Sequence, residues 1–264
     1  MATPQPSPAP VLLERQDRIA RLIINRPPLN ILDIATLGEL KARLDAALAE
    51  PEAGLLEIRG AGEEAFSAGV EVRDHFPGRV QEMLCKFHAV VRTILYAPIP
   101  TLAVVRGHCL GGGTELALAC DFILASAESQ FGQPEIKLGA LPPVAAALLP
   151  RLLGQKKALE IILRGEPFSA HEACNMGLVN RVVTSSSSGG LDAEVSKFEE
   201  GLLSMSPRVL ALARKASRQG FCEDFETRLR ESERIYLEEL LTCEDATEGL
   251  KAFLEKRPPA WKGK

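Results

Sequence analysis

The chain of 264 residues is long enough for one large domain, and its 46% of apolar residues suffice for a sizeable core. A charged fraction of 25% is typical of a soluble globular protein, and the net charge of −4 argues against nucleic acid as the main partner. No apolar run approaches the roughly 20 residues that span a bilayer, and the N-terminus lacks the features of a signal peptide. We therefore expect a cytoplasmic protein with no membrane partner.

The N-terminal part of the chain predicts a leader, a hairpin and a helix. Residues 1–10 contain four prolines and little that could pack, so we expect them to be mobile. Two β-like runs follow at Val11–Glu14 and Ala20–Asn25, and the polar residues Arg15–Arg18 between them indicate a hairpin. Apolar residues at helical spacing then predict a helix over Ile34–Ala49.

Strands and helices alternate in the next part of the chain, with a strand at Leu55–Arg59, a helix at Val80–Leu95 and a strand at Thr101–Val105. This order favours βαβ units and a mostly parallel sheet. From Pro142 onward the pattern is almost entirely helical. After a low-complexity loop at Ser185–Gly190, helices are expected at Asp192–Ser204, Pro207–Arg218, Phe225–Leu241 and Asp245–Glu255. The sequence thus predicts an α/β core over residues 11–190 and a helical region over residues 191–264.

A glycine-rich segment, Arg106–Glu115, joins a predicted strand to a short apolar helix and contains three successive glycines. Such a run lets the backbone approach a ligand and lets amide groups point outward at a helix start. The spacing is neither that of a dinucleotide-binding fingerprint nor that of a phosphate-binding loop. A second segment of small residues, Phe66–Arg73, has the same potential. Each segment alone is equally compatible with a tight structural turn.

Two glutamates are candidate acid–base groups. Glu115 opens a strongly apolar helical run, and Glu135 lies in a turn-rich segment after a short strand. If the fold brings them together, one carboxyl can act as acid and the other as base on a single water molecule. Alternatively, Glu115 is a charge stabilised by a helix N-terminus, and Glu135 is a solvated loop residue. No Cys/His spacing suggests zinc, and we expect no metal.

Three ordered segments together resemble the crotonase (enoyl-CoA hydratase/isomerase) superfamily: FSAGVEV, GHCLGGGTELALACDFILAS and FGQPEIKLGALP. The earlier INRPPLNILD resembles that family's first CoA-contacting segment, and EGLKAFLEKR near the end resembles its C-terminal motif. The resemblance runs from about residue 11 to residue 260. It implies an α/β spiral of ββα units with a C-terminal helical trimerisation region, assembled as a homotrimer or homohexamer. It also implies an acyl-CoA substrate and no separate cofactor.

The same resemblance implies an oxyanion hole and two catalytic carboxyls. Matching positions give the backbone N–H groups of Val70 and Gly112 as the oxyanion hole, and Glu115 and Glu135 as the hydratase carboxyls. The presence of both carboxyls indicates addition of water, since other branches of the family often lack one. The resemblance further assigns substrate or CoA contacts to Pro28, Leu29, Ala68, Gly69, Val70, Glu71, Val72, Arg73, Gly111, Gly112, Pro134, Pro142, Pro143, Phe253 and Lys256.

The chain departs from the common hydratase pattern after Glu135, where LPPVAAA replaces a glycine-rich stretch. With PPLNILD and SAGVEVRDH, this segment resembles the branch that hydrates cyclohexa-1,5-diene-1-carbonyl-CoA. That resemblance implies addition of water across a conjugated diene, with the proton delivered to a remote ring carbon. We expect Pro143 and Val144 to shape a ring-sized cavity and His75 either to lie near its wall or to be exposed. A straight-chain enoyl-CoA hydratase, an isomerase and a non-catalytic CoA-binding protein remain alternatives.

Overall fold

The computed structural model describes residues 9–184 and 186–264. Most of the expected mobile leader, residues 1–8, therefore lies outside the described residues, as does Ser185 of the low-complexity loop. In the part that is described, no helix combines the length and the apolar character needed to cross a bilayer.

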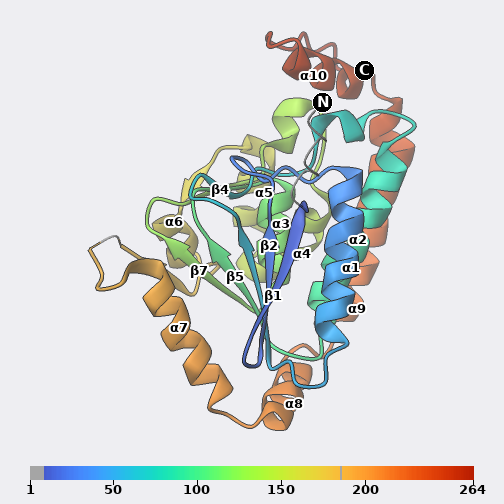
Figure 1. Ribbon diagram of the computed structural model, residues 1–264. Helices are drawn as coiled ribbons and strands as arrows, with labels where there is room; N and C mark the ends of the chain where they lie inside the picture. Colours follow the sequence, from blue (N-terminus) through green and yellow to red (C-terminus); the bar gives the residue numbers. More distant parts are fainter. Residues whose placement is uncertain (1–8, 185) are drawn as a thin grey trace, which may run out of the picture.

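The fold is a spiral in which two strands and a helix repeat along the chain (Figure 1). The first such unit comprises β1 (Val11–Gln16), β2 (Ile19–Ile24) and α1 (Ile34–Leu48). The second comprises β3 (Leu55–Gly60), β4 (Ala65–Ser67) and α2 (Val80–Leu95). The third comprises β5 (Thr101–Val105), β6 (His108–Leu110) and α3 (Gly112–Ala119). The fourth comprises β7 (Phe122–Ser126), β8 (Gln130–Gly132) and α4 (Pro143–Leu153).

The strands of each unit separate into two sheets. One sheet has the order β1-β2-β3-β5-β7-β10, and all of its neighbours are parallel except β1 and β2. The smaller sheet has the order β4-β6-β8-β9, with β9 (Phe168–Ser169) antiparallel to β8. Because β4, β6 and β8 lie side by side, the loops that follow them meet at one edge of the smaller sheet. The expected α/β class and parallel sheet are confirmed.

The expected bounds of the hairpin strands were wrong, although the hairpin itself is present. The first strand extends to Gln16 and the second begins at Ile19, so the turn is Asp17–Arg18 alone. Arg15 and Gln16 are exposed on an edge strand, where polar side chains are tolerated and hide the strand pattern.

The segment after Pro142 is almost entirely helical, as expected, and the short strands β9 and β10 (Arg181–Val183) interrupt it. Strands this short carry almost no periodicity.

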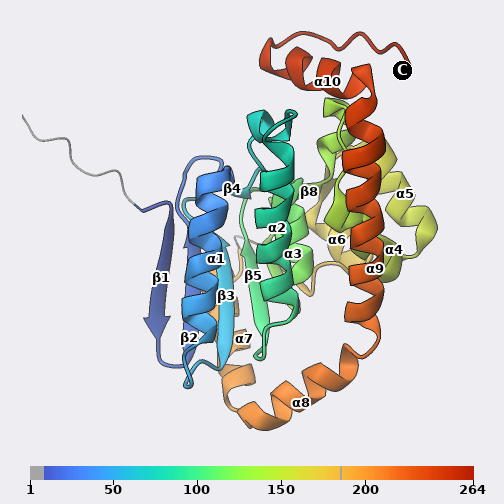
Figure 2. The same cartoon turned by 90° about the vertical axis from the view of Figure 1, so that its right-hand side faces the viewer.

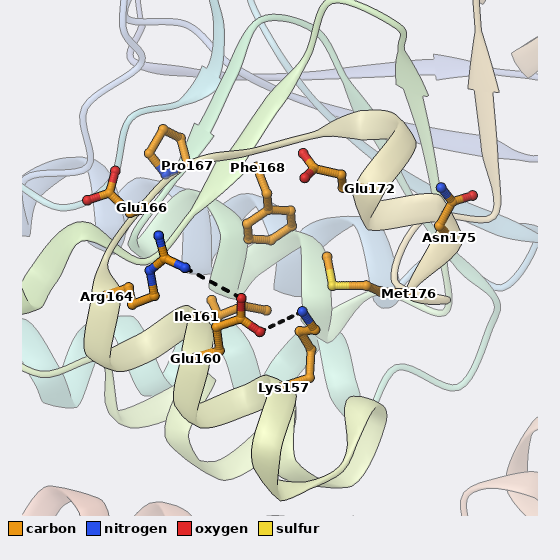
Figure 3. Close-up of a pocket in the computed structure, with 10 residues that line it drawn as sticks. All are labelled: Lys157, Glu160, Ile161, Arg164, Glu166, Pro167, Phe168, Glu172, Asn175 and Met176. Atoms are coloured by element: carbon orange, nitrogen blue, oxygen red, sulfur yellow. Dashed lines mark hydrogen bonds and ion pairs between the residues drawn. The ribbon is translucent and has the colours of Figure 1, made fainter.

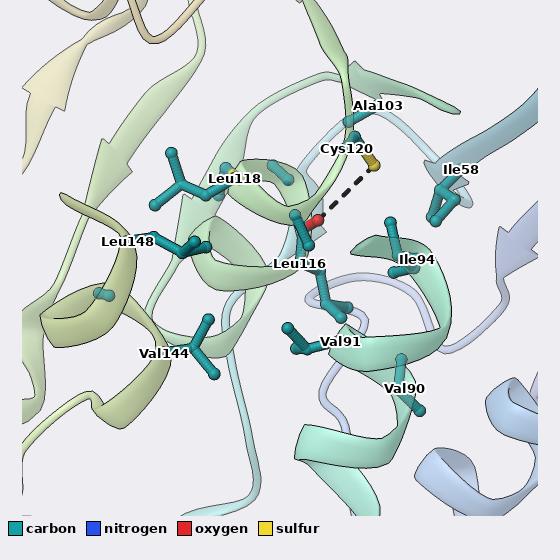
Figure 4. Packing of buried hydrophobic residues seen from close by; sticks show 14 of the residues in the cluster. Ile58, Val90, Val91, Ile94, Ala103, Leu116, Leu118, Cys120, Val144 and Leu148 are labelled. Atoms are coloured by element: carbon teal, nitrogen blue, oxygen red, sulfur yellow. Dashed lines mark hydrogen bonds between the residues drawn. The ribbon is translucent and has the colours of Figure 1, made fainter. Parts of the chain in front are cut away.

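Helices cover both faces of the main sheet. Helices α1 and α2 pack on one face, and α7 (Gly190–Leu203) packs on the other through Leu191 and Val195 (Figure 1). The central cluster in Figure 4 joins Val90 and Ile94 of α2 to Leu116 of α3 and Leu148 of α4. Every residue of α3 is buried, so Glu115 on this helix has been taken out of water.

The remaining helices are α5 (Gln155–Arg164), α6 (Ala170–Asn175), α8 (Pro207–Ser217), α9 (Phe221–Arg234) and α10 (Glu244–Leu254). Figure 2 shows α9 returning alongside α2, with α10 crossing the end of the molecule. The expected single helix over Phe225–Leu241 was wrong in its second half. There α9 gives way to a π-helical turn, Ile235–Glu239, and a 3₁₀ turn, Leu240–Thr242. The division at residues 190 and 191 stays a prediction.

Asn30 ties the segment after β2 to the loop around β4. Its side-chain amide donates to Ala65 O at 2.7 Å and to Ala61 O at 3.0 Å, and its side-chain oxygen accepts from Arg26 N at 2.9 Å. The residue is fully buried and has φ 50°, a left-handed conformation that asparagine tolerates better than alanine. Ser67 Oγ donates back to Asn30 O at 2.8 Å. Asn30 therefore fixes the position of the loop that follows β4.

Replacing Asn30 with alanine should lower the free energy of unfolding by about 2–4 kcal/mol, because buried carbonyl groups lose their donors. Urea unfolding followed by circular dichroism measures this change. The control is Asn25→Ala, since the Asn25 amide makes only an exposed hydrogen bond to Ala9 O. A loss at Asn30 no larger than that at Asn25 would contradict the assigned role.

Candidate active site

One cavity of about 610 Å³ lies where the loops after β4, β6 and β8 meet. Its other walls come from α2, from the start of α4, from the π-helical turn and from α10 with the residues after it. Leu29 and Phe253 line it with exposed fractions of 40% and 54%, so they mark its rim. Glu115 and Tyr236 also line it but are only 3% and 1% exposed, so they mark its floor. The cavity therefore runs from an apolar rim to a buried polar floor.

The two predicted oxyanion-hole loops lie in contact. A Cβ atom added to Gly69 would be 3.4 Å from Gly112 N, and one added to Gly112 would be 2.9 Å from Val70 Cγ2. Gly69 has φ 105° and Gly111 has φ 53°, conformations that favour glycine. Within the described residues, neither the Val70 N–H nor the Gly112 N–H donates a hydrogen bond. Both donors line the cavity and remain available for an oxygen atom there.

Glu115 is held by the N-terminus of a neighbouring helix. Ala145 N, in the first turn of α4, donates to Glu115 Oε1 at 2.8 Å. Burial raises the pKa of Glu115 to about 7, while the backbone N–H groups of Ala145 and Val144 act in the opposite direction. The carboxyl therefore titrates near neutral pH and can change between acid and base there.

Glu135 lies opposite, in the 3₁₀ turn Pro134–Leu138, and is 8% exposed. A Cβ atom at Gly111 would come within 2.6 Å of Glu135 Oε1, so a side chain there would displace this carboxyl. Burial, and then the charge of Glu115, raise the pKa of Glu135 well above its ordinary value. With its amide nitrogen turned toward Glu135, Gln133 donates to both carboxyl oxygens at 3.0 and 3.2 Å. The fold thus brings Glu115 and Glu135 to the same cavity, and burial raises the pKa of both carboxyls.

Most of the predicted contact residues line this cavity. Those that do are Leu29, Ala68, Gly69, Val70, Glu71, Val72, Gly111, Gly112, Pro134, Pro142, Pro143 and Phe253. Pro28, Arg73 and Lys256 are exposed and do not line it. Their neighbours Leu29, Val72 and Arg257 do, because successive residues of these segments point in different directions. Contact of Pro28, Arg73 and Lys256 with CoA stays a prediction.

Pro143 and Val144, in the segment after Glu135, lie in different surroundings. Pro143 lines the cavity, whereas the Val144 side chain packs among Val91 and Leu148 in the core (Figure 4). The expectation that Val144 shapes the cavity was therefore wrong, since its side chain lies on the buried face of α4. His75 is buried and lines the cavity, so the exposed alternative is excluded. Its Nδ1 lies 3.1 Å from Glu71 O, and burial lowers its pKa, which favours the neutral ring.

Several lining residues were not anticipated. Met83, Leu84 and Phe87 of α2 form an apolar wall, and Tyr236 completes the floor. The helical spacing of these residues is equally that of ordinary core positions, so periodicity could not distinguish them. Lys137 and Arg257 are exposed cations at the cavity, and nothing local separates them from other surface charges.

A second, smaller cavity of about 330 Å³ has a different character (Figure 3). Its Glu160 is exposed and pairs with Lys157 at 2.6 Å and with Arg164 at 3.7 Å. The hydrogen bond from Lys157 lowers the pKa of Glu160. A carboxyl that serves as an acid near neutral pH needs a raised pKa instead. Across the described chain, no group of three or more His, Cys, Asp or Glu residues could hold a metal ion. The larger cavity is therefore the candidate active site.

Comparisons with known proteins agree with this geometry. The sequence pattern of the family described as Enoyl-CoA hydratase/isomerase matches residues 14–264. The chain is 36% identical over 260 residues to cyclohexa-1,5-dienecarbonyl-CoA hydratase from Thauera aromatica, with 98% of each protein covered. It is 34% identical to crotonyl-CoA hydratase from Syntrophomonas wolfei subsp. wolfei, over 94% of this chain and 95% of that relative.

Among solved structures, an enoyl-CoA hydratase from Mycobacterium avium subsp. paratuberculosis K-10 has the same fold, with a TM-score of 0.86 and 30% identity. The match covers 96% of this chain and 99% of that structure. The full-length matches in sequence and in fold show that the chain belongs to the enoyl-CoA hydratase/isomerase family.

Proposed function

We propose that this protein adds water to an α,β-unsaturated acyl-CoA thioester. The observation that carries the proposal is the pairing of two buried carboxyls, Glu115 and Glu135, with two unoccupied backbone N–H groups in one cavity. Such donors stabilise the charge that develops on a carbonyl oxygen, each by roughly 3 kcal/mol of activation barrier. The carboxyls supply the base and the acid that hydration needs.

The groups that shift the pKa values of Glu115 and Glu135 support Glu115 as the base and Glu135 as the acid. Ionised Glu115, favoured by the N-terminus of α4, removes a proton from water as the water oxygen bonds to the β carbon. The electron pair of the double bond moves toward the thioester oxygen, which the Val70 and Gly112 N–H groups stabilise as an enolate. Protonated Glu135 then gives its proton to carbon, and the net change is one added water. In the reverse direction the same groups exchange roles.

The proposed acyl group is a conjugated cyclic diene. The relative from Thauera aromatica supports this choice, as does Pro143, whose rigid ring lines the same cavity as Glu135. Water then adds in the 1,4 sense, and the proton reaches a remote ring carbon. CoA is part of the substrate and no further cofactor is required. The exposed cations Lys137 and Arg257 lie where the CoA phosphates would leave the cavity.

A straight-chain enoyl-CoA is the second candidate substrate. It is supported by the relative from Syntrophomonas wolfei and by the apolar wall of Met83, Leu84 and Phe87, which suits an alkyl chain. An isomerase would need only one proton-transferring carboxyl, whereas this cavity holds two. A non-catalytic CoA-binding protein would not need two buried carboxyls with raised pKa values, which are typical of acid–base catalysis.

We further propose that the chain assembles as a homotrimer or homohexamer through its C-terminal region. Helix α8 buries no residue, and Val209 and Leu212 on it are 62% and 49% exposed. Exposed apolar side chains of this size are typical of surfaces covered by another subunit.

A substrate panel tests the proposed reaction. Cyclohexa-1,5-diene-1-carbonyl-CoA and crotonyl-CoA are each incubated with the protein, and product masses are measured. A mass gain of one water, with greater kcat/KM for the cyclic diene, is the expected result. A product of unchanged mass but altered double-bond position would identify an isomerase, and no reaction with either thioester would overturn the proposal.

Replacing either carboxyl by its amide should lower kcat by roughly 100-fold or more, because each amide keeps the shape but cannot transfer the proton. The variants are Glu115→Gln and Glu135→Gln, measured at saturating substrate, with circular dichroism to verify the fold. Glu160→Gln in the smaller cavity is the matched control and should retain the wild-type rate. A near-wild-type rate for Glu115→Gln would contradict its role in water activation.

The rate should depend on pH in a bell-shaped manner. Below about pH 7 Glu115 is protonated and cannot accept a proton from water, so the rate rises as pH increases through that value. At higher pH Glu135 loses its proton and the rate falls. In Glu135→Gln, the residual rate should still rise as the pH increases through about 7, but it should no longer fall at alkaline pH. An acid limb near the ordinary glutamate pKa would contradict the assignment.

A further inference from the structure

Tyr236 lies at the end of the cavity that an acyl group would reach. It lines the same cavity as the two carboxyls and is 1% exposed. Leu29 and Phe253 are exposed at the rim, so the large CoA moiety would lie in water on that side of the cavity. A thioester held between Val70 and Gly112 therefore directs its acyl group toward the floor, where Tyr236 is the largest side chain.

No hydrogen bond among the described residues involves the Tyr236 hydroxyl, and this oxygen is not one of their fully enclosed unpaired polar atoms, so it borders the cavity that Tyr236 lines. A phenylalanine would fill the same space without an unsatisfied polar group, and buried tyrosine hydroxyls usually find a partner. Burial and then the charges of Glu135 and Glu115 raise the pKa of this phenol, so the hydroxyl keeps its proton and acts as a donor. Because Tyr236 lines the same cavity as Glu115 and Glu135, this donor is available to a group bound beside the two carboxyls.

Two features fix the position of Tyr236. It lies in the π-helical turn Ile235–Glu239, a local distortion that recurs at functional sites. The preceding helix α9 is bound to α2 by the Arg92–Glu226 pair at 3.0 and 3.1 Å and by the hydrogen bond between His88 and Glu233. The anchored helix and the turn together hold the phenol against the cavity, as a group that discriminates between substrates requires.

We propose that Tyr236 is a specificity-determining residue: its ring ends the acyl site, and its hydroxyl donates to the oxygen that hydration adds to the acyl group. The site consequently selects a compact acyl group with an oxygen near the β carbon over a long alkyl chain. This inference deepens the proposed function and rests on it for the identity of the acyl-CoA ligand.

Binding of unreactive acyl-CoA thioesters tests the inference without turnover. Butyryl-CoA, octanoyl-CoA and acetoacetyl-CoA are titrated by calorimetry into the wild type, Tyr236→Ala, Tyr236→Phe and Tyr96→Phe. Tyr236→Ala removes the ring, and Tyr236→Phe removes only the hydroxyl. Tyr96→Phe is the matched control, because Tyr96 is exposed and its hydroxyl binds Glu226 and Cys222 O on the outside of α2. Thermal unfolding verifies that each variant is folded.

Tyr236→Ala should improve the Kd of octanoyl-CoA relative to butyryl-CoA by about 10-fold or more, because it opens the floor. Tyr236→Phe should leave that ratio unchanged and weaken acetoacetyl-CoA relative to butyryl-CoA by roughly 5–10-fold, the usual effect of one lost hydrogen bond. Tyr96→Phe should match the wild type in both ratios.

Unchanged ratios in folded Tyr236 variants would overturn the inference, even if the wild type hydrates its substrate. If Tyr236→Ala does not fold, Tyr236→Phe tests the inference alone. An unchanged ratio of the Kd values of acetoacetyl-CoA and butyryl-CoA in that variant would then overturn it. Conversely, the expected shifts in a protein that hydrates none of the substrate panel would refute the proposed function and leave the role of Tyr236 in acyl selection intact.

Discussion

Two buried carboxyl groups, Glu115 and Glu135, line one cavity, and no lysine or arginine among the described residues forms an ion pair with either of them; the rest of the site depends on this constraint. Burial alone disfavours an ionised carboxylate, and a second charge nearby disfavours it further. The structure accommodates the pair asymmetrically. Glu115 receives backbone N–H groups from the first turn of α4, whereas Glu135 receives the side-chain amide of Gln133. In the proposed mechanism, this asymmetry of the surroundings distinguishes the base from the acid.

The spiral explains how distant segments meet around that pair. Each ββα unit sends one loop to the same edge of the smaller sheet, so the loops after β4, β6 and β8 supply Val70, Gly112 and Glu135 respectively. Glycine is required where these loops touch, since a side chain at Gly111 would displace Glu135. Asn30 holds the first of the loops from the outside. The regular fold thus positions the proposed catalytic groups, and the irregular loops bring them to one cavity.

The sequence predicted the parallel sheet, the spiral and the meeting of the carboxyls, because ordered motifs surround each of these features. It could not predict that Val144 points into the core while Pro143 faces the cavity, since this depends on how α4 is rotated against its neighbours. It also could not distinguish Tyr236 or Arg257 from ordinary core and surface residues. Both residues reach the cavity only because the C-terminal helices dock on a core formed by earlier parts of the chain, which local sequence patterns do not encode.

The cavity combines Leu29, near the start of the chain, with Phe253 and Pro259, near its end. The cavity is therefore enclosed only when α10 and the residues after it pack against loops from the first part of the fold. Without that packing both glutamates would lie in a cleft open to water, where their pKa values relax toward ordinary ones. Docking of the last helix thus sets the electrostatic environment of carboxyls that lie more distant in the sequence.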